Sequence, residues 1–86
     1  MDEFERLMGS EVKCDLLTLI HNNASVLPAT PEELARRIGK SLAEVRAAME
    51  DFVGLGVLKK VGESYWFTAD ADRIVQKIIS AQVKSD

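Results

Sequence analysis

The chain has a single cysteine, two prolines and few aromatic residues, which make up 6% of its 86 residues. One cysteine excludes an intramolecular disulfide and a metal site built from several thiolates, so we expect no metal and no cofactor. Hydrophobic runs span only a few residues, whereas a membrane-spanning helix needs about 20. The N-terminal residues are acidic, unlike the basic start of a secretory signal, and we therefore expect a cytoplasmic protein.

Motifs of the common enzyme classes are also missing. The sequence has no nucleophile elbow, no glycine-rich phosphate loop and no histidine pair at metal-ligand spacing. Cys14 and His21 share one helical face, but they lie about 10 Å apart along the axis and no third ligand accompanies them. We therefore expect a protein that is not an enzyme.

The chain has no overall excess of basic residues, since its net charge is −3, but its charges are segregated. Residues 1–33 carry two basic and seven acidic side chains, residues 34–62 carry six and three, and residues 63–86 carry three and four. The local cluster of charge, more than the total, sets the field that a phosphate backbone meets. The basic middle segment is the part of the chain expected to face a polyanion.

Apolar residues recur every three or four positions over residues 2–23, the spacing of one helix face. Gly9-Ser10 interrupts this stripe, which predicts either one kinked helix or a short helix followed by a second one capped by Ser10. A similar stripe predicts a helix over residues 70–84, capped by Thr68 or Asp70. The proline-containing segment 25–29 suits an edge strand or a turn.

Two capping boxes stand close together in the middle of the chain. Thr30-Pro31-Glu32-Glu33 combines an N-cap hydroxyl, a proline at the first helical position and the glutamate of a capping box. Gly39 ends this helix, and Ser41-Leu42-Ala43-Glu44 begins the next one. Two helices joined by so short a turn cross at a steep angle, so residues 30–56 are predicted to form a helix-turn-helix.

After Gly56 the hydrophobic period changes from helical to alternating. Residues 57–61 and 64–68 flank Gly62-Glu63, which predicts a β-hairpin with a type II′ turn. In that register Leu58 faces Phe67 on the core side, and Lys59 lies opposite Trp66. The residues expected to be buried in this fold are Leu34, Ile38, Val45, Met49, Phe52, Leu58 and Phe67.

The order of these elements, together with the stretches Thr30–Ala35, Phe52–Leu58 and Gly62–Thr68, resembles the winged helix superfamily and its small prokaryotic transcriptional regulators. The resemblance implies a mainly α fold with a small β-hairpin: a three-helix core, a wing of two or three strands and an extra C-terminal helix. We expect one domain over residues 1–86. Its parts are an N-terminal helical segment (1–23), the helix-turn-helix (30–56), the wing (57–68) and the C-terminal helix (70–84).

The same resemblance implies that residues 41–53 form a recognition helix in the DNA major groove and that residues 59–66 form a wing that touches the DNA backbone or the minor groove. We expect Arg46 to read base edges, because arginine recognises guanine with two hydrogen bonds. The lysines and the two arginines of the preceding helix are expected to bind phosphates. The residues predicted to contact double-stranded DNA are Arg36, Arg37, Lys40, Ser41, Arg46, Lys59 and Lys60.

We expect the DNA-binding protein to be a transcriptional regulator that acts as a homodimer. One helix in one groove buries little surface, whereas two half-sites multiply the discrimination that each offers. Apolar residues near both ends of the chain form wide stripes, as interfaces do. The predicted dimer interface consists of Phe4, Leu7, Met8, Ile74, Val75, Ile78 and Ile79.

The alternative function is a winged helix that binds protein, or serves as an adaptor, without binding DNA. The acidic net charge favours it, as do Glu44 and Glu50 beside Arg46 and Glu63 at the tip of the wing. These carboxylates would approach phosphates unfavourably.

The basic and aromatic residues also have ordinary explanations. Arg36 and Arg37 can pair with the glutamates one helical turn before them. Lys59 and Lys60 can protect an exposed strand edge from sheet-to-sheet association. Trp66 either stacks on a partner or packs against Lys59 across the hairpin.

Overall fold

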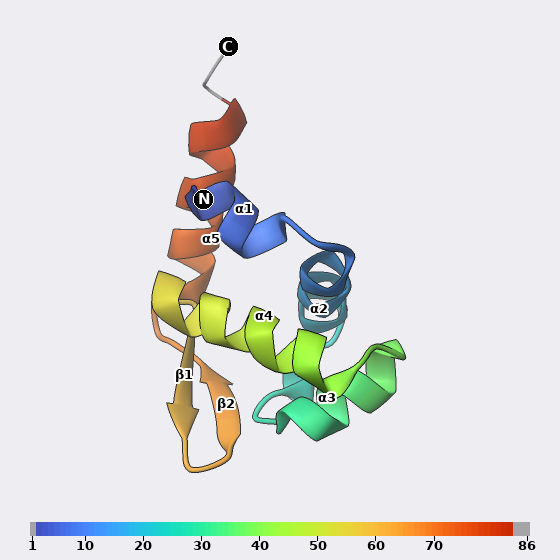
Figure 1. Ribbon diagram of the computed structural model, residues 1–86. Helices are drawn as coiled ribbons and strands as arrows, with labels where there is room; N and C mark the ends of the chain where they lie inside the picture. The colour runs from blue at the N-terminus through green and yellow to red at the C-terminus, as the bar shows by residue number, and fades with distance from the viewer. Residues whose placement is uncertain (1, 84–86) are drawn as a thin grey trace.

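The computed structural model describes residues 2–83, which form five α-helices, one short 3₁₀ helix and a two-stranded antiparallel hairpin (Figure 1). In chain order the elements are α1 (Glu3–Met8), α2 (Glu11–Asn22), η1 (Ala24–Val26), α3 (Pro31–Ile38), α4 (Leu42–Leu55), β1 (Leu58–Val61), β2 (Ser64–Phe67) and α5 (Ala71–Val83). The predicted class, mainly helical with a small β-hairpin, is confirmed. None of the described helices combines the length and the apolar composition that crossing a membrane requires.

The chain forms two helices around Gly9 instead of one kinked helix. Asp2 caps α1 by accepting the backbone N–H of Glu5 (2.8 Å), and Ser10 caps α2 by accepting that of Lys13 (3.2 Å). A Cβ atom at position 9 would clash with the carbonyl oxygen of Glu5, so glycine is required at this tight break. Of the two sequence-based alternatives, the short helix followed by a second one is confirmed.

The two helices in the middle of the chain begin and end at the predicted signals. Thr30 accepts the backbone N–H of Glu33 (3.3 Å), and the Glu33 carboxylate accepts that of Thr30 (3.2 Å), which completes a capping box. Gly39 adopts the left-handed conformation (φ +69°) and ends α3. The second box forms only in part: Ser41 accepts the N–H of Glu44 (3.2 Å), but the Glu44 carboxylate accepts the Ser41 hydroxyl instead of a backbone N–H.

The hairpin has the predicted register, with Leu58 paired to Phe67 and Lys59 paired to Trp66. Gly62 has φ +63°, and Glu63 has a negative φ, since no described residue other than glycine has a positive value. A positive φ at the first central residue alone is the pattern of a type II′ turn. The free edge of β2 meets Ala29 in a single antiparallel bridge to Tyr65. Segment 25–29 therefore forms a short 3₁₀ turn followed by one bridge.

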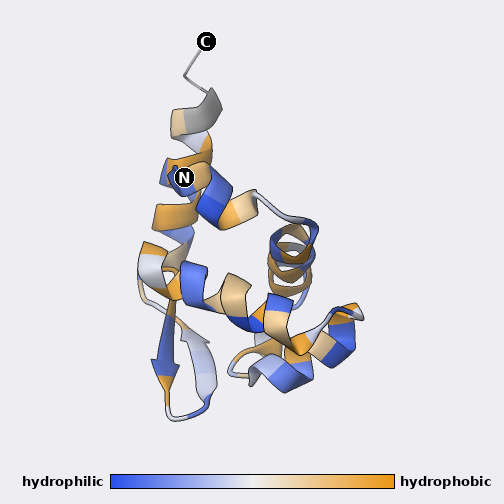
Figure 2. Cartoon of the chain, viewed as in Figure 1, coloured by the Kyte–Doolittle hydropathy of each residue, from blue (hydrophilic) through white to orange (hydrophobic). Residues whose placement is uncertain are grey.

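One hydrophobic cluster joins all the elements, and α4 crosses its centre in contact with α1, α2, α3 and β1 (Figure 1). Figure 2 shows hydrophobic and hydrophilic residues interspersed along α4, as expected for a helix with one apolar face and one polar face. Five predicted core residues are buried, namely Leu34, Val45, Met49, Phe52 and Leu58. Ile38 and Phe67 are only half-buried, which corrects the prediction. Ile38 ends α3 where the chain turns away, and Phe67 borders an open groove.

The N-terminal helix belongs to this core and is not a free element. α1 packs against α4 and α5, and Leu7 is completely buried between them. Ile78 of α5 is 5% exposed. The prediction that Leu7 and Ile78 lie at a dimer interface is therefore wrong, because the chain itself covers both. The other residues of that predicted interface are half-buried against the same core, namely Phe4, Met8, Ile74, Val75 and Ile79.

The C-terminal helix begins at Ala71, one residue later than predicted, and residue 84 lies outside the described residues. Thr68, one of its two expected caps, donates its hydroxyl to the Gly56 carbonyl instead (2.6 Å). This hydrogen bond ties the end of α4 to the segment that leads into α5.

Candidate nucleic-acid interface

The solvent-facing side of α4 includes a stripe formed by Ala43, Arg46, Ala47 and Glu50, all of which are exposed, and Leu42 and Glu44 in its first turn are exposed as well. Their spacing by threes and fours places them on one helical face. The opposite face is buried in the core through Val45, Ala48, Met49 and Phe52. Because two residues of this stripe are alanines, another surface can approach the helix backbone closely between the long polar side chains of Arg46 and Glu50.

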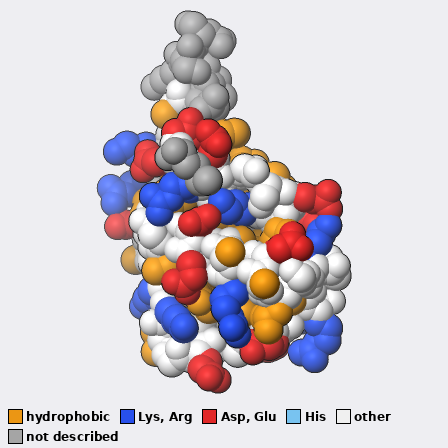
Figure 3. All heavy atoms as spheres, viewed as in Figure 1, with side chains coloured by type: hydrophobic (Ala, Val, Ile, Leu, Met, Phe, Trp, Pro, Cys, Tyr) orange, Lys and Arg blue, Asp and Glu red, His pale blue; other side chains and the backbone are white. Residues whose placement is uncertain are grey.

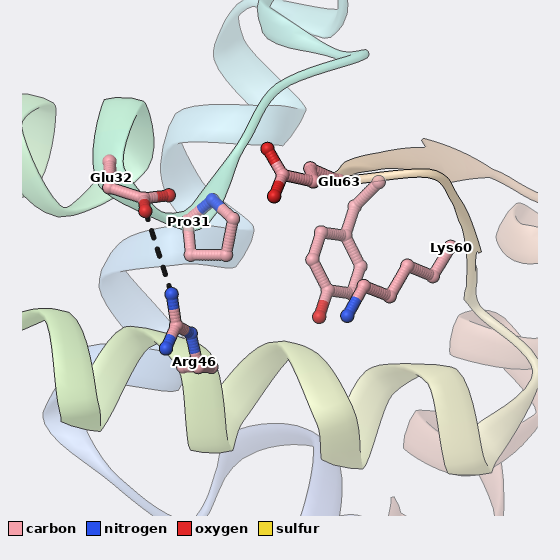
Figure 4. Close-up of a pocket in the computed structure, with 6 residues that line it drawn as sticks. Pro31, Glu32, Arg46, Lys60 and Glu63 are labelled. Carbon is pink, nitrogen blue, oxygen red and sulfur yellow. Dashed lines mark ion pairs between the residues drawn. The ribbon is translucent and has the colours of Figure 1, made fainter.

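Beside this stripe lies a cavity of about 300 Å³ between α4, the start of α3 and the hairpin. We call it the α4–hairpin cleft. Figure 4 shows Arg46 extending from α4 toward Glu32, while Glu63 and Lys60 come from the hairpin on the other side. The residues that line the cleft are Pro31, Glu32, Arg46, Lys60, Glu63 and Tyr65. Two cations and two carboxylates therefore share one small cleft.

Within the cleft Arg46 forms an ion pair with Glu32, at 3.5 Å between Nη2 and Oε2. Both side chains are more than half exposed, at 56% and 59%. Exposed ion pairs of this kind contribute about 0–1 kcal/mol, because water and salt screen them. A phosphate or a base can therefore compete with Glu32 for the guanidinium group.

Tyr65 connects the hairpin to α4. Its ring is buried, and its hydroxyl donates a hydrogen bond to Oε2 of Glu50 (2.6 Å). Burial and the Glu50 carboxylate raise the pKa of Tyr65 to about 12, so the hydroxyl keeps its proton at neutral pH. Lys60 lies over the same ring, with Nζ 5.7 Å from its centroid. Glu50, expected to face solvent beside Arg46, thus holds the hairpin against α4.

Tyr65 is the residue of this site that the sequence analysis missed. The signal for it was present in the predicted register, because a residue two positions from Phe67 lies on the same face of the strand. That face is the core side, and Tyr65 is paired with Lys60 across the hairpin.

Arg36 and Arg37 are exposed in the last turn of α3, and neither takes part in an ion pair with another described residue. The alternative ion pairs, with the glutamates one helical turn earlier, do not form. Glu32 pairs with Arg46, and Glu33 is held by the capping box. The hydrogen bond from the Thr30 backbone is the main cause that lowers the pKa of Glu33. Both arginines are thus available to an external anion.

Lys40 faces the opposite way, toward α2. It forms an ion pair with Glu11, and Asp15 lies 4.0 Å from its Nζ atom. The hydrogen bond between Lys40 and Glu11 lowers the pKa of Glu11 and raises the pKa of Lys40. Lys40 therefore links α2 to the turn between α3 and α4, and acidic side chains balance its charge.

Lys59 and Lys60 lie on opposite faces of the hairpin, because successive residues of a strand alternate. Lys60 lines the α4–hairpin cleft, whereas Lys59 lies on the outer face opposite Trp66, which is 42% exposed. The structure thus brings Arg46 and Lys60 together and separates Lys59 from them. Ser41 serves as the N-cap of α4.

Figure 3 shows basic and acidic side chains interspersed over the face that carries α4 and the hairpin. The predicted cations are therefore present on a surface of mixed charge. Comparison with known proteins gives no match to a family model, to a curated protein or to a solved structure.

Proposed function

We propose that the protein is a winged helix DNA-binding protein and a transcriptional regulator, with α3 and α4 as its helix-turn-helix and β1–β2 as its wing. The observation that carries this proposal is the exposed stripe of α4. This stripe contains two alanines and Arg46, and it lies directly beside a hairpin. An α-helix about 10–12 Å wide fits the major groove of B-DNA, which is about 12 Å wide. Alanines at the contact let the helix enter deeply and touch thymine methyl groups.

In this proposal Arg46 hydrogen-bonds to a base edge after its ion pair with Glu32 breaks. Arg36 and Arg37 bind phosphates from the end of α3, and Lys60 does so from the wing. The backbone N–H groups at the start of α4, next to Ser41, add a further site for a phosphate. Lys40 does not contact DNA but links the turn between α3 and α4 to α2. Lys59 lies on the outer face of the wing, away from the cleft.

A homodimer in the cytoplasm completes the proposal. A single recognition helix with one arginine discriminates sequences weakly, and two half-sites on one duplex multiply that discrimination.

Selection of duplexes from a random-sequence library, followed by titration at low salt, tests this proposal. Arg46→Ala is expected to lower discrimination by about 1–3 kcal/mol at one base pair. Replacing Arg36 and Arg37 together by glutamine is expected to weaken all duplexes alike and to reduce the salt slope by about two units. Arg73→Gln is the matched control, because this exposed arginine of α5 lies outside the cleft. Equal effects of the three changes would contradict the proposed interface.

A protein-binding module is the second candidate function, and one observation favours it. Two of the exposed large hydrophobic residues, Val61 (57% exposed) and Trp66 (42% exposed), lie on the outer face of the hairpin with Lys59. Exposed aromatic and aliphatic residues beside a cation are typical of surfaces that bind proteins. If the protein binds no duplex at low salt, this candidate replaces the first.

A further inference from the structure

A second cavity lies on another part of the molecule, between α2 and α5. It is a groove of about 390 Å³, which is within the range of about 300–1,000 Å³ typical of small-molecule sites. We call it the α2–α5 groove. Ile20, Val57 and Ala71 line it and are at most 5% exposed, so the groove reaches down to the core. Phe67, half-buried at its side, completes a largely apolar wall.

The polar groups of the groove lie among its exposed residues. Thr18, His21, Gln76 and Asp72 are all exposed and line it. Among the described residues that line the groove, Asp72 is the only aspartate or glutamate, and none is a lysine or an arginine. Within residues 2–83 the Asp72 carboxylate forms no ion pair, whereas neighbouring Asp70 is paired with Arg73 at 3.0 Å. The groove thus combines an apolar wall with one unpaired negative charge.

We propose that the α2–α5 groove binds a small amphipathic cation. The apolar part of the ligand packs against Leu17, Phe67 and Val75, and its positive group lies at the Asp72 carboxylate. Charge complementarity selects this ligand class: an anion would meet Asp72 without a compensating cation, and a neutral molecule would leave the carboxylate unused. The volume corresponds to a small organic molecule.

Three eight-carbon probes distinguish the contributions of charge and of the apolar chain: octyltrimethylammonium and octanoate, each below its micelle-forming concentration, and 1-octanol below its solubility limit. Cys14 lines the groove and is the only cysteine of the chain, so its rate of alkylation by iodoacetamide reports on occupancy. Octyltrimethylammonium is expected to slow the alkylation of Cys14 at the lowest concentration. It is also expected to shift the amide resonances of Thr18, Ala71 and Val75.

Asp72→Asn is expected to weaken the cationic probe by up to about five-fold, the most that an exposed ion pair contributes, and to leave 1-octanol unchanged. Asp70→Asn is the matched control, because it removes the carboxylate two residues earlier, outside the groove. Val75→Phe, which fills the groove, is expected to weaken all three probes.

Equal binding of the three probes, or tighter binding of octanoate, would overturn the assignment of a cation. Failure of every probe to protect Cys14 would overturn the site itself. If raising the protein concentration alone protects Cys14, with dimers in sedimentation, a second copy of the chain occupies the groove and the proposal is wrong.

Discussion

The ion pair between Glu32 and Arg46 makes a direct prediction about DNA affinity. Glu32 lies in the first turn of α3, and its carboxylate is 3.5 Å from the guanidinium group of Arg46. Glu32→Gln keeps the shape of the side chain but removes one negative charge from the α4–hairpin cleft. It also leaves Arg46 without its partner among the described residues. We expect this variant to bind duplex DNA more tightly than the wild type.

The magnitude follows from the exposure of the pair. Because both side chains are more than half exposed, the ion pair contributes about 0–1 kcal/mol. Under the proposed function, releasing Arg46 is therefore expected to tighten DNA binding by up to about five-fold, since about 1.4 kcal/mol corresponds to a factor of ten. The free energy of unfolding should fall by only about 1 kcal/mol, because the variant also loses a carboxylate at the positive end of α3.

Fluorescence anisotropy with one labelled duplex measures this change, and urea unfolding measures the stability of the same variant. Glu3→Gln is the matched control, since this exposed glutamate in the first turn of α1 changes the net charge equally. An equal gain in both variants would mean that net charge alone is responsible. A loss of affinity in Glu32→Gln would refute the idea that Glu32 competes with DNA for Arg46.

Three further changes test the packing around the candidate interface, each by urea unfolding. Phe52→Ala should cost about 3–5 kcal/mol because the ring is 1% exposed, and a cost below about 2 kcal/mol would contradict its central place in the core. Lys13→Met should cost about 1–2 kcal/mol, because it leaves the partly exposed Asp51 without its ion pair at 2.8 Å, and no loss would show that the pair is energetically neutral. Tyr65→Phe should cost about 1 kcal/mol at neutral pH by removing the hydrogen bond to Glu50. The folded pKa of Tyr65 is raised from 10.0 to about 12, so wild-type stability from this group is complete below pH 10 and is lost as the pH rises toward 12. The phenylalanine variant should lack that alkaline loss, and the same loss in both proteins would exclude Tyr65 as its source.

The lowered pKa values of two exposed carboxyl groups make the stability of the protein depend on pH in acid. The pKa of Glu11 is lowered by its hydrogen bond with Lys40, and the pKa of Glu33 is lowered mainly by its hydrogen bond with the Thr30 backbone. A lowered folded pKa stabilises the protein above the unfolded value, and this contribution is lost as the pH falls through the folded value. In acid, protonation of Glu11 and Glu33 therefore weakens the ion pair with Lys40 and the capping box at the start of α3.

The helix boundaries could be predicted from the sequence because their signals are local. The Thr30 capping box, the left-handed Gly39 and the Ser41 cap each involve hydrogen bonds between residues at most four apart. The hairpin register follows for the same reason, since a two-residue turn at Gly62-Glu63 leaves one pairing of the flanking strands.

The contacts between distant segments could not be predicted in this way. Lys40 is 29 residues from Glu11, and its ion pair depends on how α2 docks against the turn after α3. The burial of Leu7 likewise depends on α1 packing against α4 and α5, which hydrophobic spacing alone does not reveal. An apolar stripe fits an interface and a core equally well, and Leu7 belongs to the core.

The candidate interface shows the same division. The exposure of Arg46 follows from helical spacing, and the opposite orientations of Lys59 and Lys60 follow from strand alternation. The ion-pair partner of Arg46 could not be predicted from such local spacing, because Glu32 reaches Arg46 from the start of another helix. The α2–α5 groove was equally hidden, since its walls come from four separate parts of the chain.

Titration of the wild-type protein with random-sequence duplex DNA, repeated over a range of salt concentrations, tests the proposed function most directly. With phosphate contacts from Arg36, Arg37 and Lys60, the logarithm of the binding constant should fall linearly with the logarithm of salt concentration, with a slope of about −3 per protomer. No binding at low salt, or binding that salt does not weaken, would contradict the proposal.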